Sequence, residues 1–194
     1  MARPRKFNVD EALDAAMNAF WERGYEATSL ADLMQAMGLQ KGSIYKAFGD
    51  KHSLFMNAME RYLNAAYEFH RTVIEGEASP KEGLKAWIEK LTEFSTSKQG
   101  ICRGCLMINT TIELGPHDAE METPLKIHFS RLEKLLAKTV ARGQKLSEFR
   151  QDMNSTQLGE LLLSVMTGLF VGLKGPMTED KSRRIWGMAL QVLE

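Results

Sequence analysis

The segment from Thr28 to Lys51 constrains the fold of this chain more than any other part of the sequence. Its first half carries apolar residues at i, i+3, i+4 and i+7, the one-sided spacing of a short amphipathic helix: Leu30, Leu33, Met34 and Met37. Gly38 follows directly, and glycine lets a chain reverse direction where a side chain would clash. A second helical pattern begins two residues later. The segment is therefore predicted to form a helix-turn-helix.

The second helix of this motif is predicted to run from about Gln40 to Phe48. Ile44 and Phe48 lie on one face of it, and the other faces are polar. The polar side chains are those of Gln40, Lys41, Ser43, Tyr45 and Lys46. A surface of this kind suits base edges and phosphates in a DNA major groove. Gly49 and Asp50 end the helix, and Asp50 is well placed to cap a long following helix.

The segment from Gly24 to Leu54 closely resembles the DNA-binding domain of the TetR family of transcriptional repressors. The matching residues are Gly24-Tyr25, Thr28, the run Gly38-Leu39-Gln40-Lys41-Gly42-Ser43-Ile44-Tyr45, Phe48, and Lys51 followed three residues later by Leu54. The resemblance implies an all-α protein with an N-terminal three-helix DNA-binding domain and a C-terminal helical bundle. It also implies a homodimeric repressor that a small molecule, or an electrophile or oxidant, releases from a palindromic operator.

The resemblance further implies which residues contact double-stranded DNA. They are Thr28, Gln40, Lys41, Gly42, Ser43, Tyr45, Lys46 and Lys51. Tyr45 and Lys51 look like phosphate contacts, joined by Thr28, whereas Gln40, Lys41, Ser43 and Lys46 are placed to meet bases. Simpler interpretations stay open: Thr28 or Ser29 as a helix cap, Lys46 as a solvated charge and Gln40 as a turn residue.

Net charge does not by itself indicate a nucleic-acid partner. The chain has 25 Lys and Arg residues against 25 Asp and Glu residues, so it has no overall cationic field. Positive charge is local, with Arg3, Arg5 and Lys6 ahead of the first predicted helix and three lysines around the second helix of the motif. We expect weak non-specific DNA binding. Arg3 and Arg5 either enter an adjacent minor groove or belong to a disordered basic tail.

Helical periodicity extends along the rest of the chain, which predicts about nine helices and no strand. The first predicted helix lies between Val9 and Gly24, the next two belong to the motif, and the fourth extends for more than twenty residues after Asp50. A fifth begins at Pro80, a sixth spans Cys105 to Leu114, and a seventh begins at His117. The last two span Ser155 to Lys174 and about Glu179 to Leu193. Asn8 and Glu11 form a predicted capping box. Pro124 either kinks its helix or begins the regular part behind a Thr123 cap.

Two domains are expected, a DNA-binding domain over residues 1–50 and a ligand-binding and dimerisation domain over residues 51–194. No apolar run approaches the length of about eighteen residues that a membrane span requires. The N-terminus lacks the apolar core of a secretory signal. We therefore expect a cytoplasmic protein.

Near-heptad apolar spacing marks the helix from Ser155 to Lys174, where Gly168 and Gly172 lie four residues apart. A buried core helix accounts for this pattern. The resemblance favours a four-helix dimer interface instead, built from Leu161, Val165, Gly168, Leu169, Gly172, Ile185, Met188 and Ala189. A dimer suits a regulator because two reading helices can recognise a palindrome.

The larger domain is expected to hold the signal input, since a ligand must distinguish two conformations to shift their balance. Mixed apolar and polar candidates for a ligand lining are Met107, Asn109, Thr110, Glu113, His117, Phe129, Trp87 and Phe94. Each of them can equally be a core or surface residue. No catalytic residues, cofactor or metal are expected.

Cys102 and Cys105 are the only cysteines, and four interpretations of the pair stay open. A dithiol oxidoreductase would need a preceding strand, and none is predicted. A zinc site would need two more ligands, such as His117 and His128. An inert buried thiol is the simplest alternative. A reactive sensor is favoured by a helix N-terminus and a nearby arginine, and the resemblance adds Lys174 as a residue that lowers the pKa of Cys105.

Overall fold

A computed structural model describes residues 7–95, 103–115 and 117–194 of the chain. Within these ranges the secondary structure consists of nine helices and no strand. The helices are α1 (Val9–Arg23), α2 (Leu30–Met37), α3 (Lys41–Phe48), α4 (Lys51–Glu75), α5 (Pro80–Ser95), α6 (Leu106–Glu113), α7 (Ala119–Lys145), α8 (Ser155–Lys174) and α9 (Glu179–Leu193). The all-α prediction is confirmed.

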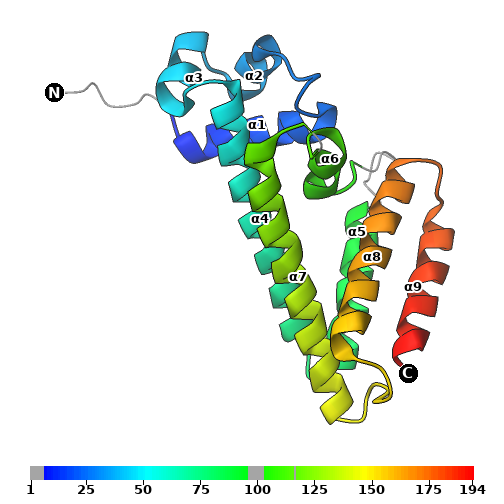
Figure 1. Cartoon of the computed structure of the whole chain (residues 1–194). Coiled ribbons are helices and arrows are strands. Elements are labelled where there is room, and N and C mark those ends of the chain that lie inside the picture. Colours follow the sequence, from blue (N-terminus) through cyan, green and yellow to red (C-terminus); the bar gives the residue numbers. More distant parts are fainter. Residues whose placement is uncertain (1–6, 96–102, 116) are drawn as a thin grey trace.

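The helices form a small head and an elongated body (Figure 1). The head consists of α1, α2 and α3, gathered at the N-terminal end of α4. The body consists of α4 to α9, of which α4, α5, α7, α8 and α9 run along its length, while the short α6 lies beside the head. The head packs on the start of α4 through Phe20, Leu33, Ile44, Leu54 and Phe55, which are all at most 1% exposed.

Side-chain caps set the starts of the head helices. The Asn8 carboxamide oxygen accepts the backbone N–H groups of Asp10 and Glu11. The Nδ2 atom of Asn8 donates to the Glu11 carboxylate at 3.0 Å. Ser29 caps α2 in a reciprocal capping box with Asp32. Asp50 accepts the Ser53 N–H at 2.7 Å and so caps α4. These contacts satisfy N–H groups that a helix start leaves unpaired, which explains why the predicted boundaries hold.

Of the two alternatives for Pro124, the start of a helix behind a Thr123 cap is wrong. The helix begins at Ala119, because the Asp118 carboxylate accepts the N–H groups of Glu120 and Met121 at 3.0 and 3.1 Å. Pro124 therefore lies inside α7. Met121 is fully buried and holds the first turn against the core.

Two long helices, α7 and α8, pack closely along the body. A Cβ atom at Gly159 would lie 2.7 Å from the backbone nitrogen of Ala137, so only glycine permits this approach. By length and composition α8 could cross a membrane, and among the described residues only α8 meets that test. The expectation that no segment would meet it was therefore wrong. A core helix passes the same test, and one face of α8 is buried within the protomer.

Candidate nucleic-acid interface and ligand cavity

The outer face of α3 is polar and solvent-exposed, as the sequence predicts. Ile44 and Phe48 are buried against the rest of the head, whereas Lys41, Tyr45 and Lys46 are exposed. The Lys41 ammonium lies 5.4 Å from the centroid of the Tyr45 ring, which places a cation and a phenol side by side. A Cβ at Gly42 would have no atom within 4 Å, so the backbone of this first turn is open to a close partner. Ser43 is half-buried.

The turn between α2 and α3 depends on Gly38. Its φ of 63° and ψ of 27° lie in the left-handed region, which side-chain-bearing residues rarely adopt. Gln40 precedes α3 as its cap residue, but its side chain makes no capping hydrogen bond. The exposed carboxamide of Gln40 is therefore available to an external partner rather than committed to the turn.

Lys51 lies at the first position of α4, with its ammonium 4.4 Å from the centroid of the Tyr25 ring. The aromatic ring holds this cation near the base of α3. Its position agrees with a phosphate contact at the edge of the head.

Thr28 has a structural role that differs from the expected DNA contact. Its side chain has no exposed surface, and its hydroxyl donates to the Gly24 carbonyl at 2.5 Å. The cap of α2 is Ser29, not Thr28. Thr28 therefore stabilises the turn between α1 and α2, and its hydroxyl cannot reach a phosphate in this conformation. Arg3 and Arg5 lie outside the described residues.

The residues expected at the dimer interface fall into two groups. Leu161, Gly168 and Met188 are exposed along one side of α8 and α9, and Val165 and Ile185 are half-buried. Sequence spacing missed Val171, which is 44% exposed on the same side of α8, three residues after Gly168.

Two of the expected interface residues serve the protomer instead, which corrects the prediction. Leu169 and Ala189 are at most 5% exposed and belong to the core of the protomer. Gly172 is half-buried beside the end of the Met177 side chain, and its place in the interface stays a prediction. Near-heptad spacing identifies an apolar helix but cannot separate a partner face from a core face.

The expected ligand residues are dispersed. Met107 is only 1% exposed and packs in the core, and His117 is exposed at the surface. Asn109, Glu113 and Lys174 line a cavity of about 410 Å³ between the end of α1, α6 and the end of α8. Cys105 lines a different cavity.

The second cavity has a volume of about 460 Å³ and lies between α1, α4, α5 and α8. It is the space most suited to an apolar ligand, because its walls are largely aromatic and aliphatic. Sequence reasoning named only Cys105 and Phe94 of its lining, because the lining comes from four helices that are distant in sequence. The residues that form it are Asp14, Met17, Trp21, Arg61, Tyr62, Ala65, Ala66, Phe69, His70, Leu91, Phe94, Cys105, Met166 and Phe170.

Cys105 is buried, which changes the expected chemistry of its thiol. It precedes α6, and its Sγ lies 3.2 Å from the Tyr62 hydroxyl. Burial raises the pKa of the Cys105 thiol, which favours the interpretation as an inert buried thiol over a reactive sensor in this conformation. The aliphatic part of Lys174 approaches Gly104, one residue before Cys105. Cys102 lies outside the described residues, and within the described part of the chain no cluster of His, Cys, Asp and Glu could hold a metal ion.

Comparison with known proteins places this architecture in a family. Residues 12–58 match the family described as "Bacterial regulatory proteins, tetR family", and residues 80–185 match "Tetracyclin repressor-like, C-terminal domain". The helix-turn-helix head and the helical body thus define a bacterial regulatory protein rather than an enzyme. The chain belongs to the TetR family.

Relatives are similar over most or all of the chain. The transcriptional repressor ComR of Escherichia coli is 31% identical over 98% of this chain and 90% of its own length. YezE of Bacillus subtilis, an uncharacterised transcriptional regulator, is 29% identical over 79% of this chain and 77% of its own. A cysteine mutant of the TetR-family regulator CifR, solved with a 26-bp operator DNA, is 30% identical, covers 100% of both chains and has a TM-score of 0.86.

Proposed function

We propose that this protein is a sequence-specific transcriptional repressor that binds a palindromic operator as a homodimer and is released by a small molecule. The observation that carries the proposal is the arrangement of α3. Ile44 and Phe48 fix one face in the head, while Lys41, Tyr45 and Lys46 project to solvent. An α-helix presented in this way fits the major groove of B-DNA.

Homodimerisation supports the same function. A single eight-residue helix such as α3 reads few base pairs, whereas two copies related by a two-fold axis read a palindrome. The exposed apolar residues Leu161, Val171 and Met188 supply a surface on α8 and α9 for the second copy. ComR is named a transcriptional repressor, and the CifR mutant was solved with operator DNA. We extend repression and operator binding to this chain on that basis.

A dithiol oxidoreductase that uses Cys102 and Cys105 is the alternative from a different class. An exchange reaction needs an accessible thiolate. Cys105 is 8% exposed, and burial raises the pKa of its thiol. Neither observation favours this activity.

An electrophile that releases the repressor from its operator through Cys105 must reach this thiol through the apolar cavity. Iodoacetamide and iodoacetate test this route, because they alkylate thiols in the same way and differ in charge. We expect native Cys105 to react far more slowly than the urea-unfolded chain and to discriminate against the anion. Equal, rapid modification of Cys105 by both reagents, measured by peptide mass, would contradict a buried apolar site.

Selection of DNA from a random pool tests the proposed function directly. The purified protein is expected to enrich a two-fold symmetric sequence. A gel shift with the enriched sequence and a scrambled control then measures specificity at a stated salt concentration. Equal affinity for both duplexes would contradict sequence-specific repression.

A further inference from the structure

We propose that the 460 Å³ cavity between α1, α4, α5 and α8 binds a neutral, largely apolar small molecule, and that α6 connects its occupancy to the position of the head. This inference rests on the proposed function and specifies its ligand class and regulation. The volume lies in the range of small-molecule sites.

The walls of this cavity determine the apolar character of the ligand. They include the side chains of Met17, Trp21, Phe69, Leu91, Phe94 and Phe170. The Trp21 ring lies 5.0 Å from that of Tyr62 and 5.6 Å from that of Phe94, so three aromatic groups adjoin one another on one side. Phe69 and Phe94 are large apolar side chains that stay exposed in this conformation. An apolar ligand would cover such surface and gain the free energy of its removal from water.

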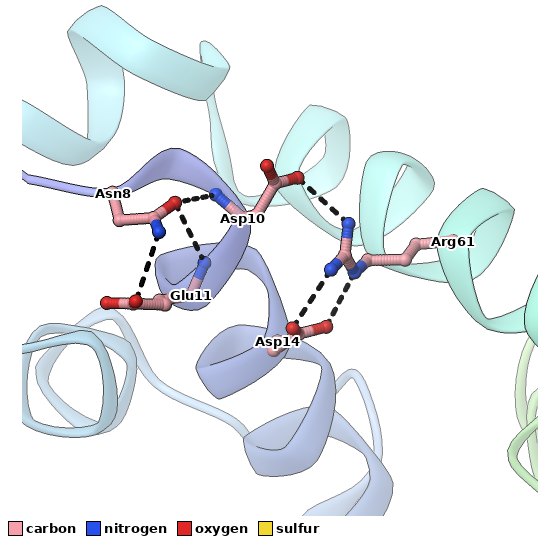
Figure 2. A network of polar contacts seen from close by, with 5 residues as sticks. All are labelled: Asn8, Asp10, Glu11, Asp14 and Arg61. Carbon is pink, nitrogen blue, oxygen red and sulfur yellow. Dashed lines mark hydrogen bonds and ion pairs between the residues drawn. The ribbon is translucent and has the colours of Figure 1, made fainter.

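The charges around the cavity determine the neutral character of the ligand. Arg61 is bound by two carboxylates, with its Nε and Nη2 donating to Asp14 at 2.5 and 3.0 Å and its Nη1 donating to Asp10 at 2.9 Å (Figure 2). The guanidinium is therefore already neutralised. His70 is uncharged, because burial lowers its pKa to about 3, and its Nδ1 accepts the Trp87 indole N–H at 2.8 Å. An ionised ligand would lose its hydration without gaining an unpaired counter-charge.

One polar group can orient the ligand. Burial raises the pKa of the Tyr62 hydroxyl well above its usual value, so the phenol stays protonated. Its oxygen accepts the Leu106 N–H at 3.2 Å, and it lies 3.2 Å from Cys105 Sγ. The thiol is a weak acceptor, so a ligand carbonyl or ether oxygen could take the Tyr62 O–H in its place.

Two sets of contacts connect this site to the head. Met17 and Trp21 belong to α1, so the shape of the cavity depends on where the head lies. The residues at the start of α6 contact Tyr62 at the cavity wall. At the other end of α6, the Glu113 carboxylate accepts the backbone N–H groups of Tyr25 and Glu26 at 3.0 and 2.8 Å. A ligand that displaces the start of α6 therefore acts on the turn that precedes the helix-turn-helix.

Two naphthylamine dyes test the ligand class. N-phenyl-1-naphthylamine is neutral, and 8-anilino-1-naphthalenesulfonate is the same skeleton with a sulfonate. We expect the neutral dye to bind the full-length protein with one site per chain and at least ten-fold more tightly than the anion. Equal affinity for the two dyes, or preference for the anion, would overturn the proposal.

Filling the cavity from two sides locates the dye. Ala66→Phe fills it from α4, and Met17→Trp fills it from α1. We expect each to weaken the neutral dye by ten-fold or more while circular dichroism keeps the helical signal. Asn64→Phe is the matched control, because Asn64 lies two residues from Ala66 on α4 and lines a separate cavity of about 340 Å³ between α4 and α7. Loss of binding in the Asn64 variant alone would place the ligand in that other cavity and overturn the proposal.

The coupling between dye binding and DNA binding is measured with the DNA selected from the random pool. The dye and DNA should weaken each other's binding by the same factor, as linkage requires. Glu113→Gln should retain dye affinity within two-fold and lose most of this mutual effect, because the two N–H groups bind different carboxylate oxygens and the amide replaces one of these oxygens with an NH2 donor. Dye binding without any effect on DNA, or unchanged coupling in Glu113→Gln, overturns the connection through α6. Failure of the protein to select any DNA would contradict the proposed function, while the dye titrations would still test the cavity.

Discussion

The Glu113 carboxylate lies 3.0 Å from the backbone nitrogen of Tyr25, a residue 88 positions earlier in the chain. A Cβ at Gly24 would lie 2.8 Å from the same carboxylate, so the glycine makes room for it. The turn between α1 and α2 thus has its N–H groups satisfied by a side chain of the body. The head is held by α6 as well as by its junction with α4.

We expect Glu113→Ala to destabilise the protein by about 1–2 kcal/mol, because two backbone N–H groups lose a charged acceptor. Urea unfolding at fixed protein concentration measures this change. Glu120→Ala is a suitable control, since the Glu120 side chain is 76% exposed and lies 3.7 Å from His52. Equal midpoints for the two variants would show that the Glu113 contact contributes nothing to stability.

Substitutions on α3 and at the start of α4 should separate affinity from specificity. Tyr45→Phe and Lys51→Ala remove expected phosphate contacts and should weaken binding to all sequences alike. The Lys51 change should also reduce the dependence of log affinity on log salt by about one unit. Lys41→Ala and Ser43→Ala should alter sequence preference, at a cost of about 1–3 kcal/mol on the preferred operator. Titrations against the operator and a scrambled duplex distinguish these results. Unchanged DNA affinity in both pairs of variants would mean that α3 does not enter the major groove as proposed.

The exposed side of α8 and α9 should control assembly. Met188 is 66% exposed, and Met188→Glu would bury a charge in a dimer interface. We expect this variant to shift the protein towards monomer in analytical ultracentrifugation. Ile127→Glu is the control, because Ile127 is 55% exposed on α7, outside the proposed interface. Dissociation caused by the Ile127 change, with the Met188 variant still dimeric, would place the interface elsewhere.

Acid should destabilise the fold through two buried histidines. Burial lowers the pKa of His70 to about 3 and that of His128 to about 4, from the ordinary value of 6.5. The unfolded chain therefore binds more protons between pH 6.5 and pH 4, so stability is full above pH 6.5 and falls as the pH decreases through this window. At pH 5 each histidine contributes a loss of about 2 kcal/mol.

Urea unfolding at pH 7 and pH 5 measures this loss, and His128→Phe provides the comparison. The His128 Nδ1 is buried with no hydrogen-bond partner in the described structure, so the substitution removes a titrating group without breaking a bond of that nitrogen. We expect a smaller difference between the two pH values in the variant. The same difference in both proteins would show that His128 is not responsible.

Local features could be read from the sequence, and long-range packing could not. The caps at Asn8, Ser29 and Asp50 act within three residues, so α1, α2 and α4 begin where expected. The start of α7 stayed open between two alternatives because Pro124 can lie either inside a helix or in its first turn, whereas the two hydrogen bonds of Asp118 set the actual start.

The candidate functional sites show the same difference between features set by local sequence and features set by long-range packing. Exposure of the α3 face follows from its own periodicity, but the burial of Thr28 depends on the shape of the turn before it. The cavity combines Trp21, Tyr62 and Phe170 from three helices, and no local pattern indicates that these side chains meet.

The most direct test of the central proposal is the stoichiometry and symmetry of the complex between the purified protein and its selected DNA. We expect two chains on each two-fold symmetric site, with footprints over two half-sites in successive major grooves. A strictly monomeric protein that binds all duplexes equally at low ionic strength would contradict the proposal.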